Sequence, residues 1–540
     1  MRAYHGAGPA CARSPRFRCD LTRAIGLRDL AAGLGYRGGI VGAGVADRGI
    51  RVARSFLRRL GTSRMVTNTG AYLAGTMLNR LFPLLLVPVY TRIWSTAEFG
   101  AWGFCMTVLN VLLIVSGLGL DAATTRLYYD HHDAREIQRF LVVGFVLRIA
   151  VALGTAVVLI GPLVTVWPWI SGGVIPAFPF VPLLLAGSSI QAVVAFNLAN
   201  ARAERRAKAF IQIQLAQALL QAIASLGFVL AGWGAAGAFY GYTIGAGIVG
   251  VVAGARFLHR NRTTGPLPWG QMRENLAYGV KTLPVALSMW LRRMADRVII
   301  GRSVSMTDLG LYQLSASGMA PLSILMASFN AAYLPFFYEK RRQGDGSLAL
   351  IAAMDMGIVA VLAMLSVGVM AVAPELIRLL GPPRYAGAEY MTPALVLSVM
   401  LDGIQLQFTK ELMFHKRPGL ASWMTTPPSL LGVVADLLLI PHYGAIAAAW
   451  VAASVSATIL IGCIIATRRV ERTGHDLRRL GLACALVAAY ALAASEWLPG
   501  RPFNLSALAV RLGCAGGVCA VIVLILAPGN IRTVMKALGR

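Results

Sequence analysis

Charge is scarce in this sequence, and negative charge is the scarcest. Only 14% of its 540 residues are Asp, Glu, Lys or Arg, whereas 57% are hydrophobic and the mean hydropathy is +0.66. A soluble globular protein carries about 25% charged residues. The chain therefore has too little charge to cover a water-facing surface of this size. We expect lipid to face most of it, and we predict a polytopic membrane protein.

The residue patterns of enzymes and metal sites are also missing. The seven cysteines form no CxxC pair and five of them lie in apolar stretches, which argues against a disulfide framework or a zinc site. The seven histidines are scattered, with no HExxH motif, and no GxxxxGK[ST] loop is present for ATP. We therefore predict that the protein is not an enzyme and has no catalytic residue and no metal.

The positive charge that is present has a topological explanation. Lys and Arg number 50 against 23 Asp and Glu, which gives a net charge of +27. Such an excess is typical of nucleic-acid binding, but here the basic residues stand in short runs between apolar stretches. Loop orientation in a membrane accounts for this pattern, and we expect no nucleic-acid partner.

The apolar stretches predict an all-α fold of about fourteen transmembrane helices. Each predicted span has the roughly 20 apolar residues that cross a bilayer. An even number of spans places both termini on the same side. The predicted spans are 69–91, 100–120, 140–161, 177–198, 209–231, 235–256, 278–301, 310–334, 349–372, 389–409, 420–440, 445–467, 480–498 and 506–527.

The loops between these spans indicate which ends of the helices face the cytoplasm. Basic residues gather in alternate loops, for example at 202–208, 340–342 and 468–479, while the intervening loops hold few, among them Arg92 and Arg302. Loops rich in Lys and Arg stay in the cytoplasm. We therefore predict a multi-pass protein of the cell inner membrane with both termini cytoplasmic.

The first 64 residues differ from the rest. They are rich in Arg, Gly and Ala and have no apolar run long enough for a signal peptide. We predict a disordered or weakly helical basic arm over 1–64. Two interpretations stay open: the arm binds anionic lipid headgroups, or it is an extension and the protein begins at Met65.

An internal repeat divides the spans into two halves. The stretch 92–102 and the stretch 302–312 share the order basic, Ser, acidic, apolar, Gly, aromatic, and 234–240 resembles 444–450 at the same offset. Six spans per half is an even number, so both halves insert the same way up, as parallel repeats. The predicted organisation is an N-lobe at 65–257, a cytoplasmic linker at 258–277, a C-lobe at 278–467 and an extension with two further helices at 468–540.

An ordered set of short motifs resembles a known family. The set comprises Asn79-Arg80-Leu81, Pro88, the Ser-Thr-Ala-Glu-Phe-Gly turn at 95–100, Gly117-Leu-Gly119-Leu120, Asp296-Arg297, Asp308-Leu-Gly310-Leu-Tyr312 and Tyr443-Gly444. These motifs resemble the polysaccharide transporter branch of the multidrug/oligosaccharidyl-lipid/polysaccharide exporter superfamily. The resemblance covers roughly residues 65–470.

This resemblance implies a function. Members of the branch move polyprenyl-diphosphate-linked oligosaccharide repeat units across the cytoplasmic membrane for O-antigen, capsule or exopolysaccharide assembly. It implies two lobes that alternate access and no bound cofactor. The implied partners are the lipid-linked oligosaccharide, membrane lipids, and a polysaccharide polymerase and glycosyltransferases of the same pathway.

The predicted seventh span carries an unusual set of charges. Lys281, Arg292, Arg293, Asp296 and Arg297 all lie within it. A charged side chain at the bilayer centre costs about 2.5–3.5 kcal/mol on insertion scales, so it needs a partner or water. Asp296 is spaced to pair with Arg292 or Arg293, but one carboxylate cannot neutralise three guanidinium groups.

The surplus predicts a basic cavity that binds the diphosphate of a lipid-linked substrate, because guanidinium groups bind phosphate oxygens in a fixed fork. We assign Arg292, Arg293, Asp296 and Arg297 to it, together with Arg80 in the first span. An internal structural pair and side chains that extend to the membrane surface are the alternatives.

Three further charged residues lie in other spans. Arg148 is close to a membrane edge, and we expect its side chain to extend to the surface. Asp402 and Asp436 are candidate carboxylates for ion coupling or for pairing with arginine, and a salt bridge is the simpler expectation for each.

Other functions fit parts of these patterns. A peptidoglycan-precursor lipid flippase or a multidrug/cation antiporter of the same superfamily shares the predicted architecture, although an antiporter is expected to have acidic cavity walls. A membrane polysaccharide polymerase or ligase is the enzyme alternative, but such enzymes have a large external loop, which is missing here.

Overall fold

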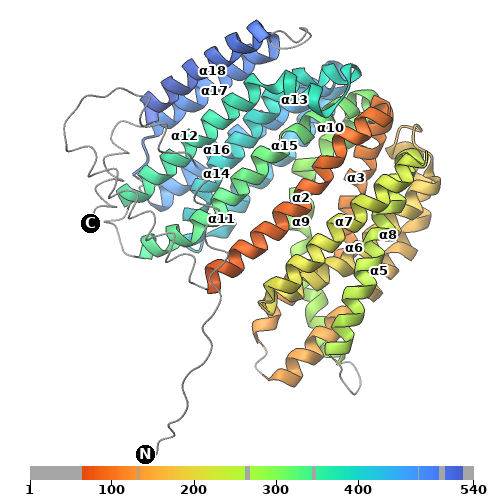
Figure 1. Ribbon diagram of the computed structural model, residues 1–540. Coiled ribbons are helices and arrows are strands. Elements are labelled where there is room, and N and C mark those ends of the chain that lie inside the picture. Colours follow the sequence, from red (N-terminus) through yellow and green to blue (C-terminus); the bar gives the residue numbers. More distant parts are fainter. Residues whose placement is uncertain are drawn as a thin grey trace, which may run out of the picture. The chain divides into compact units, whose positions relative to one another are not determined.

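A computed structural model describes residues 64–130, 133–261, 268–342, 348–471, 474–497 and 505–526 of the chain. Every regular element in these residues is a helix (Figure 1). The prediction of an all-α fold is confirmed. The predicted basic arm lies outside the described residues, except for Arg64.

The described helices before residue 261 are named the N-lobe here. Among them α7 packs against both α2 and α8, and α6 packs against α5 and α8. The N-lobe consists of α2 (Arg64–Ile93), α3 (Thr96–Gly117), the short α4 (Leu120–Leu127), η1 (Tyr128–Asp130), α5 (Ala134–Ile170), α6 (Ala177–Ala203), α7 (Ala207–Leu230) and α8 (Gly234–Arg260).

The helices from α9 to α16 are named the C-lobe, and its central contact is between α14 and α16. The predicted lobe boundaries at 257 and 278 stay predictions. The C-lobe consists of α9 (Trp269–Ser303), α10 (Met306–Gly318), α11 (Ala320–Arg342), α12 (Leu348–Ala371), α13 (Ala373–Leu380), η3 (Pro383–Tyr390), α14 (Thr392–Phe414), α15 (Pro418–Tyr443) and α16 (Ala445–Val470).

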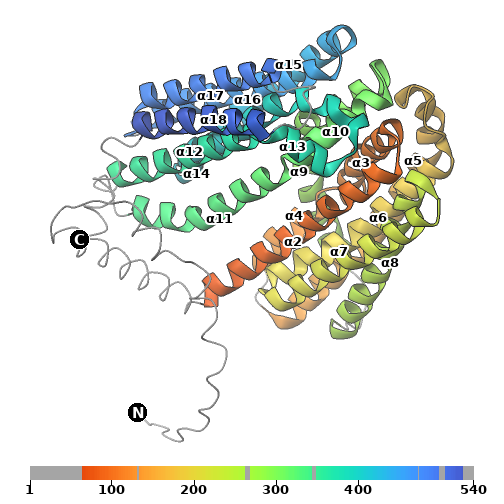
Figure 2. The same ribbon diagram turned by 45° about the horizontal axis from the view of Figure 1, so that its top comes forward.

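The last two helices form a pair that packs on the C-lobe. Helices α17 (Leu477–Trp497) and α18 (Leu505–Leu526) contact each other, and both contact α12 (Figure 2). An ion pair between Arg511 of α18 and Glu375 of α13 adds a polar contact. The predicted extension with two further helices is therefore helical and lies against the C-lobe.

Most of these helices are suited to a membrane. In the described residues eleven segments are long and apolar enough to cross one, with α10 and α11 counted together as Met306–Arg342, or twelve if η3 and α14, which are bent by 50°, form one span. Helices α2 and α9 are not among them, and α9 carries the charges noted above. The chain is a multi-pass membrane protein, while the count of fourteen spans stays a prediction.

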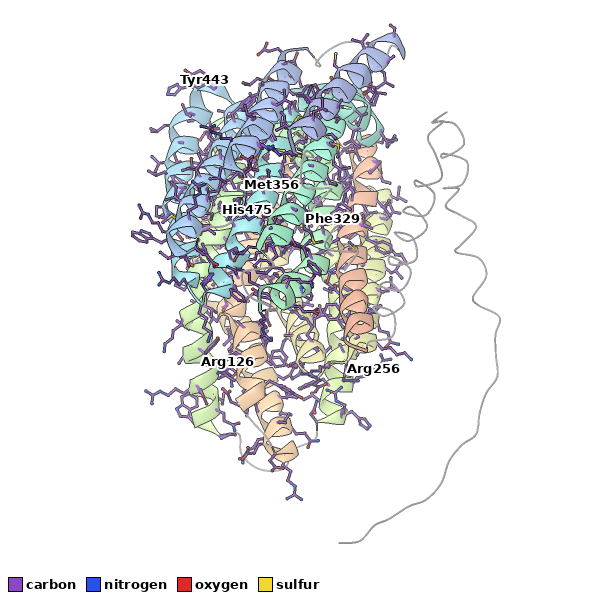
Figure 3. The ribbon with its side chains drawn as sticks, turned by 90° about the vertical axis from the view of Figure 1, so that its left-hand side faces the viewer. Arg126, Arg256, Phe329, Met356, Tyr443 and His475 are labelled. Atoms are coloured by element: carbon purple, nitrogen blue, oxygen red, sulfur yellow. The ribbon has the colours of Figure 1, made fainter. Side chains whose placement is uncertain are left out.

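Exposed apolar side chains support the same conclusion. Val157 of α5 is 76% exposed, Val251 of α8 is 72% exposed and Leu438 of α15 is 64% exposed. Contact of such side chains with water is unfavourable, whereas contact with lipid is not. Arg126 and Arg256, predicted to be cytoplasmic, lie near one end of the helices, and Tyr443, predicted to be external, lies near the other (Figure 3).

The sequence repeat corresponds to a repeated helix start. Ser95 caps α3 by accepting a hydrogen bond from the backbone N–H of Glu98 at 3.2 Å, and Ser305 caps α10 by accepting one from Asp308 at 3.0 Å. A Ser with an acidic residue three positions later satisfies N–H groups that a helix start leaves unpaired. The shared order of residues in the two stretches is therefore a shared capping motif.

The two capped helices cross at glycines of the repeat. A Cβ atom on Gly100 of α3 would lie 1.8 Å from the carbonyl oxygen of Met306, and one on Gly310 of α10 would lie 2.0 Å from that of Thr96. Both clashes are with backbone, so only glycine permits this approach. The equivalent helices of the two lobes thus contact each other through equivalent residues.

Further hydrogen bonds join the lobes at the same end. The guanidinium of Arg384 donates to the carbonyl oxygens of Thr91, Arg92 and Trp94 at 2.8, 3.1 and 2.9 Å. The hydroxyl of Tyr385 donates to the carbonyl oxygen of Ser95 at 3.1 Å. These contacts lie at the end of the helices that is predicted to be external.

Candidate functional site

Helix α9, which carries the predicted site, contacts both lobes. It packs against α3, α4 and α5 of the N-lobe and against α10, α15 and α16 of the C-lobe. The indole N–H of Trp290 donates to the carbonyl oxygen of Thr107 in α3 at 3.2 Å. A Cβ on Gly279 would lie 2.3 Å from the carbonyl oxygen of Leu118, so the approach to the N-lobe is close here too. A movement of α9 would therefore alter contacts with both lobes.

Arg292 forms a two-point ion pair with Asp402 of α14. Its Nη1 and Nη2 donate to Oδ1 and Oδ2 of Asp402 at 3.1 and 3.2 Å. The hydroxyl of Ser456 in α16 donates to the same carboxylate at 3.0 Å. The pair is mostly but not fully buried, with 18% of the Arg292 side chain and 27% of the Asp402 side chain exposed. Asp402 is thus the pairing carboxylate that the sequence suggested.

Asp296 is held one turn further along α9. It pairs with Arg297 at 3.2 Å and accepts a hydrogen bond from the hydroxyl of Tyr312 in α10. Arg297 also donates to the side-chain oxygen of Gln313 at 3.1 Å and lies over the Tyr312 ring at 5.5 Å. Because Arg292 turns to Asp402, its expected pair with Asp296 is not formed.

Asp436 of α15 faces this second pair. Its side chain is 7% exposed, and it lies within electrostatic reach of Asp296. Its Oδ1 has no hydrogen-bond partner among the described residues. No ion pair between Asp436 and an arginine is present in the part of the chain that the structure describes, and its part in ion coupling stays a prediction.

Helices α14 and α15 bring carboxylates to α9 that the sequence argument did not count. Arg292 pairs with Asp402 of α14, and Asp436 of α15 lies within electrostatic reach of Asp296. The sequence argument counted the carboxylates of one helix only. The surplus of positive charge on α9 is therefore smaller than predicted.

Two predicted site residues remain, Arg293 and Arg80. Arg293 is exposed on α9, and its carbonyl oxygen accepts a hydrogen bond from Arg297 at 2.7 Å. Arg80 lies within α2, but its side chain is outside the described residues. The structure thus brings together the predicted residues of α9 with Asp402 and Asp436, and leaves the place of the Arg80 side chain untested.

Arg148 does not extend to the membrane surface, so that expectation is wrong. Its side chain is 1% exposed and donates to the carbonyl oxygens of Ala192 and Gly117 at 2.8 and 2.5 Å. It also pairs with Asp121 of α4 at 3.2 Å. A guanidinium has five donors, and these partners satisfy it inside the N-lobe. Arg148 therefore joins α5 to α3, α4 and α6.

A second buried charge cluster was not predicted. The ammonium of Lys410 donates to Asp355 at 2.5 Å and lies 4.0 Å from the centroid of the Tyr333 ring. His475, in the link between α16 and α17, contacts the other oxygen of Asp355 at 2.9 Å. The predicted span ended at residue 409, which placed Lys410 in a loop. The signal that could have found the cluster is the Lys410-Glu411 pair inside an apolar helix.

Beside this cluster lies a group with the donor types of a metal site. Glu411, His415 and Glu471 each offer one ligand atom within 4.8 Å of the others. The guanidinium of Arg341 donates to both carboxylates, at 3.0 Å to Glu411. This cation already occupies the space between the carboxylates and would repel a second one. The group is an ion-pair network at the ends of α11, α14 and α16.

The fold is that of a known class of membrane transporter. The lipid II flippase MurJ, in an inward closed conformation, matches 84% of this chain and 98% of its own with a TM-score of 0.64 at 13% identity. A multidrug resistance MATE family transporter of the MOP superfamily, in an inward-facing conformation, matches 80% of this chain and 99% of its own with a TM-score of 0.54 at 16% identity. The molecule thus has the helical fold of MOP-superfamily transporters.

Sequence comparison gives the family. The model of the family described as polysaccharide biosynthesis protein matches residues 89–387, which is more than half of the chain. The chain belongs to this family, in the polysaccharide transporter branch of the superfamily, as its motifs predicted. A protein of the Lsg locus of Haemophilus influenzae is 21% identical over 399 residues, which cover 69% of this chain and 93% of that protein.

Proposed function

We propose that the protein is a flippase that moves polyprenyl-diphosphate-linked oligosaccharide repeat units across the cytoplasmic membrane. Its membership of the polysaccharide biosynthesis family and its likeness in fold to a lipid flippase support this proposal. In this proposal both termini are cytoplasmic, and the product serves O-antigen, capsule or exopolysaccharide assembly. Glycosyltransferases supply the repeat unit, and a polysaccharide polymerase uses it.

The observation that carries the proposal is the charged stretch of α9, the helix that contacts both lobes. Arg292 holds a carboxylate by two hydrogen bonds, and a phosphate group accepts the same two-point contact. A diphosphate that reaches Arg292 would replace Asp402 and release α9 from α14. Substrate binding would thereby weaken a contact between helices, which is how a ligand shifts a conformational equilibrium.

Asp402 and Asp436 have different parts in this mechanism. Asp402 is the internal partner that returns to Arg292 when the substrate leaves. Asp436, buried beside Asp296 and without a hydrogen bond at Oδ1, is the candidate for coupling to protons. Loss of its proton would place a second negative charge near Asp296 and strengthen the attraction for Arg297. The polyprenyl tail stays in lipid throughout, so it supplies no direction to transport.

A peptidoglycan-precursor lipid flippase is the second candidate function. The observation in its favour is the fold, since the MurJ structure aligns over nearly its full length. Fold likeness at 13% identity does not determine a substrate. The family match favours the polysaccharide precursor, and a transport assay with both lipid-linked substrates separates the two.

The test is surface polysaccharide in cells that carry variants of the protein. Arg297→Ala and Arg80→Ala are expected to abolish glycan export with normal membrane insertion. Arg468→Ala is the control, because it removes an exposed basic residue in the last turn of α16 that takes no part in the ion pairs of α9 described above. Normal surface polysaccharide in both the Arg297 and Arg80 variants would contradict the proposal.

A further inference from the structure

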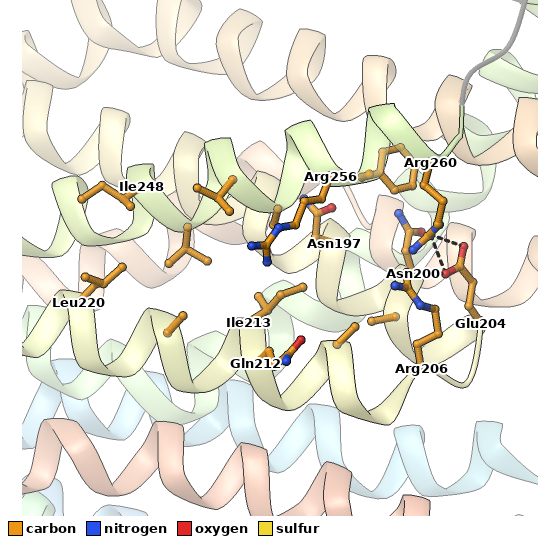
Figure 4. Close-up of a pocket in the computed structure, with 17 residues that line it drawn as sticks. Asn197, Asn200, Glu204, Arg206, Gln212, Ile213, Leu220, Ile248, Arg256 and Arg260 are labelled. Carbon is orange, nitrogen blue, oxygen red and sulfur yellow. Dashed lines mark hydrogen bonds and ion pairs between the residues drawn. The ribbon is translucent and has the colours of Figure 1, made fainter.

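A pocket opens in the N-lobe, apart from the charged stretch of α9. It lies between α6, α7 and α8 and has a volume of about 250 Å³. Figure 4 shows side chains of α7 and α8 projecting toward each other across it, with Arg206 and Arg260 toward one end, Leu220 and Ile248 toward the other and Arg256 between them. The pocket is thus polar at one end and apolar at the other.

The polar end carries a net positive charge. Glu204 accepts from Arg260 at 2.7 Å through both of its oxygens and pairs with Arg206 at 3.3 Å. No hydrogen bond or ion pair with a described residue is recorded for Arg256, which is exposed and lines the pocket. One carboxylate therefore faces three guanidinium groups, so an anion would be attracted here.

A buried amide at the same end has no partner. Asn200 lines the pocket and is 2% exposed, yet neither its Nδ2 nor its Oδ1 has a hydrogen-bond partner among the described residues. Buried polar groups are nearly always hydrogen-bonded, because leaving one unpaired costs about 1–3 kcal/mol. An amide in this state points to a polar group that occupies the pocket.

The apolar wall of the pocket is partly exposed on the surface of the lobe. Ile248 is 48% exposed and Val252 is 43% exposed, and both line the pocket with Ile213 and Leu220. The basic end coincides with the loops predicted to be cytoplasmic. The pocket would therefore have its charges at the headgroup level of the inner leaflet and its apolar wall beside the acyl chains.

We propose that this pocket binds an anionic membrane phospholipid. Its phosphate would contact Arg256 and the amide of Asn200, and one acyl chain would lie along the wall of α7 and α8. Basic pockets between transmembrane helices on the cytoplasmic side bind such headgroups.

The position of the pocket argues against the transported substrate. The pocket lies within one lobe, away from the ion pairs of α9. The site is thus separate from the proposed transport path. If the pocket proved to bind no phospholipid, the proposed flippase function would be unaffected.

The test is native mass spectrometry of the purified full chain with phosphatidylglycerol or phosphatidylcholine of identical acyl chains. Arg256→Gln removes one charge from the pocket, and Ala253→Phe fills it without a change of charge. Lys208→Gln is the matched control, because Lys208 is an exposed basic residue of α7 that does not line the pocket. Arg256 is exposed as well, so its replacement should not impair folding.

The wild type is expected to bind phosphatidylglycerol about tenfold more tightly than phosphatidylcholine. Arg256→Gln should lower the affinity for phosphatidylglycerol about tenfold, as expected for the loss of a hydrogen bond to a charged group. Ala253→Phe should weaken binding too, Lys208→Gln should change it less than about twofold, and inorganic phosphate should not displace the lipid.

Equal binding of the two lipids, or equal loss in Arg256→Gln and Lys208→Gln, would overturn the proposal. Displacement of phosphatidylglycerol by inorganic phosphate would show an anion site without a lipid. Displacement by polyprenyl diphosphate at lower concentration would assign the pocket to the transported substrate. Either result contradicts a phospholipid site.

Discussion

Replacement of Gly100 by alanine should force the two lobes apart at the predicted external end. The new Cβ would lie 1.8 Å from the carbonyl oxygen of Met306, and this backbone atom would have to retreat by about 1.2 Å to reach a distance of 3.0 Å. Gly310→Ala should act in the same way from the other lobe, since its Cβ would lie 2.0 Å from the carbonyl oxygen of Thr96. Neither clash can be relieved by turning a side chain.

The magnitude follows from the cost of overpacking. An extra methyl group in a well-packed contact costs about 1–3 kcal/mol. If the lobes separate at this end during transport, the cost falls on the joined state alone. A bias of this size changes the ratio of the two states by about 5-fold to 150-fold. The variants should therefore populate a state in which α3 and α10 are separated.

The distance between spin labels on the two lobes measures this change. Trp233 and Tyr443 are equivalent positions of the repeat, and they are 53% and 71% exposed, so both positions are accessible to labels. In a cysteine-free background, Gly100→Ala and Gly310→Ala should each shift the distance distribution. Gly154→Ala is the control, because its Cβ would meet no atom within 4 Å. Distributions in all three variants that match the unsubstituted protein would refute the reasoning.

Three further variants test the buried charges. Asp355→Asn leaves the buried ammonium of Lys410 without a carboxylate and should cost about 3–5 kcal/mol, measured as a lower thermal midpoint in detergent. Arg148→Met removes two hydrogen bonds to carbonyl oxygens and should cost about 1–3 kcal/mol each in the same assay. Burial raises the pKa of Glu204 above its ordinary value of 4.5, so Glu204 should gain a proton and release Arg260 as the pH falls through that raised pKa. Phosphatidylglycerol binding should then rise with falling pH, and Glu204→Gln should remove that dependence.

The sign of the Glu204 effect on stability follows from the same shift. A raised pKa in the folded state means that the folded protein holds this proton more tightly than the unfolded chain. The contribution of Glu204 therefore favours folding as the pH falls through the interval between the ordinary and the raised value. A thermal midpoint that moved the opposite way for the wild type relative to Glu204→Gln would contradict this assignment.

The helices and their repeat could be predicted because their signals are local. Apolar runs of helical length place α3, whereas the single predicted span 310–334 covers parts of both α10 and α11. The Ser and the acidic residue of the repeat were evident in sequence, and the structure shows that they cap α3 and α10. The glycines of the repeat were visible in sequence as well. Their role in the crossing of α3 with α10 was not, because it depends on which helices meet.

The candidate site could be predicted only in part. The charges of α9 are evident in sequence, but Arg292 is paired with a residue 110 positions away. A helical pattern indicates which residues share a face and says nothing of which helix packs there. The same limit explains Arg148, whose partners come from α3, α4 and α6, and Lys410, whose carboxylate comes from α12.

The most direct test of the proposed function is transport by the purified protein in liposomes. A lipid-linked oligosaccharide with a fluorescent sugar is placed in both leaflets, and an impermeant quencher measures the fraction that crosses. The wild type should move the substrate, Arg292→Ala and Arg297→Ala should not, and Arg468→Ala should match the wild type. Equal transport in all four proteins, or none in the wild type with either a polysaccharide precursor or a peptidoglycan precursor, would contradict a flippase that works through α9.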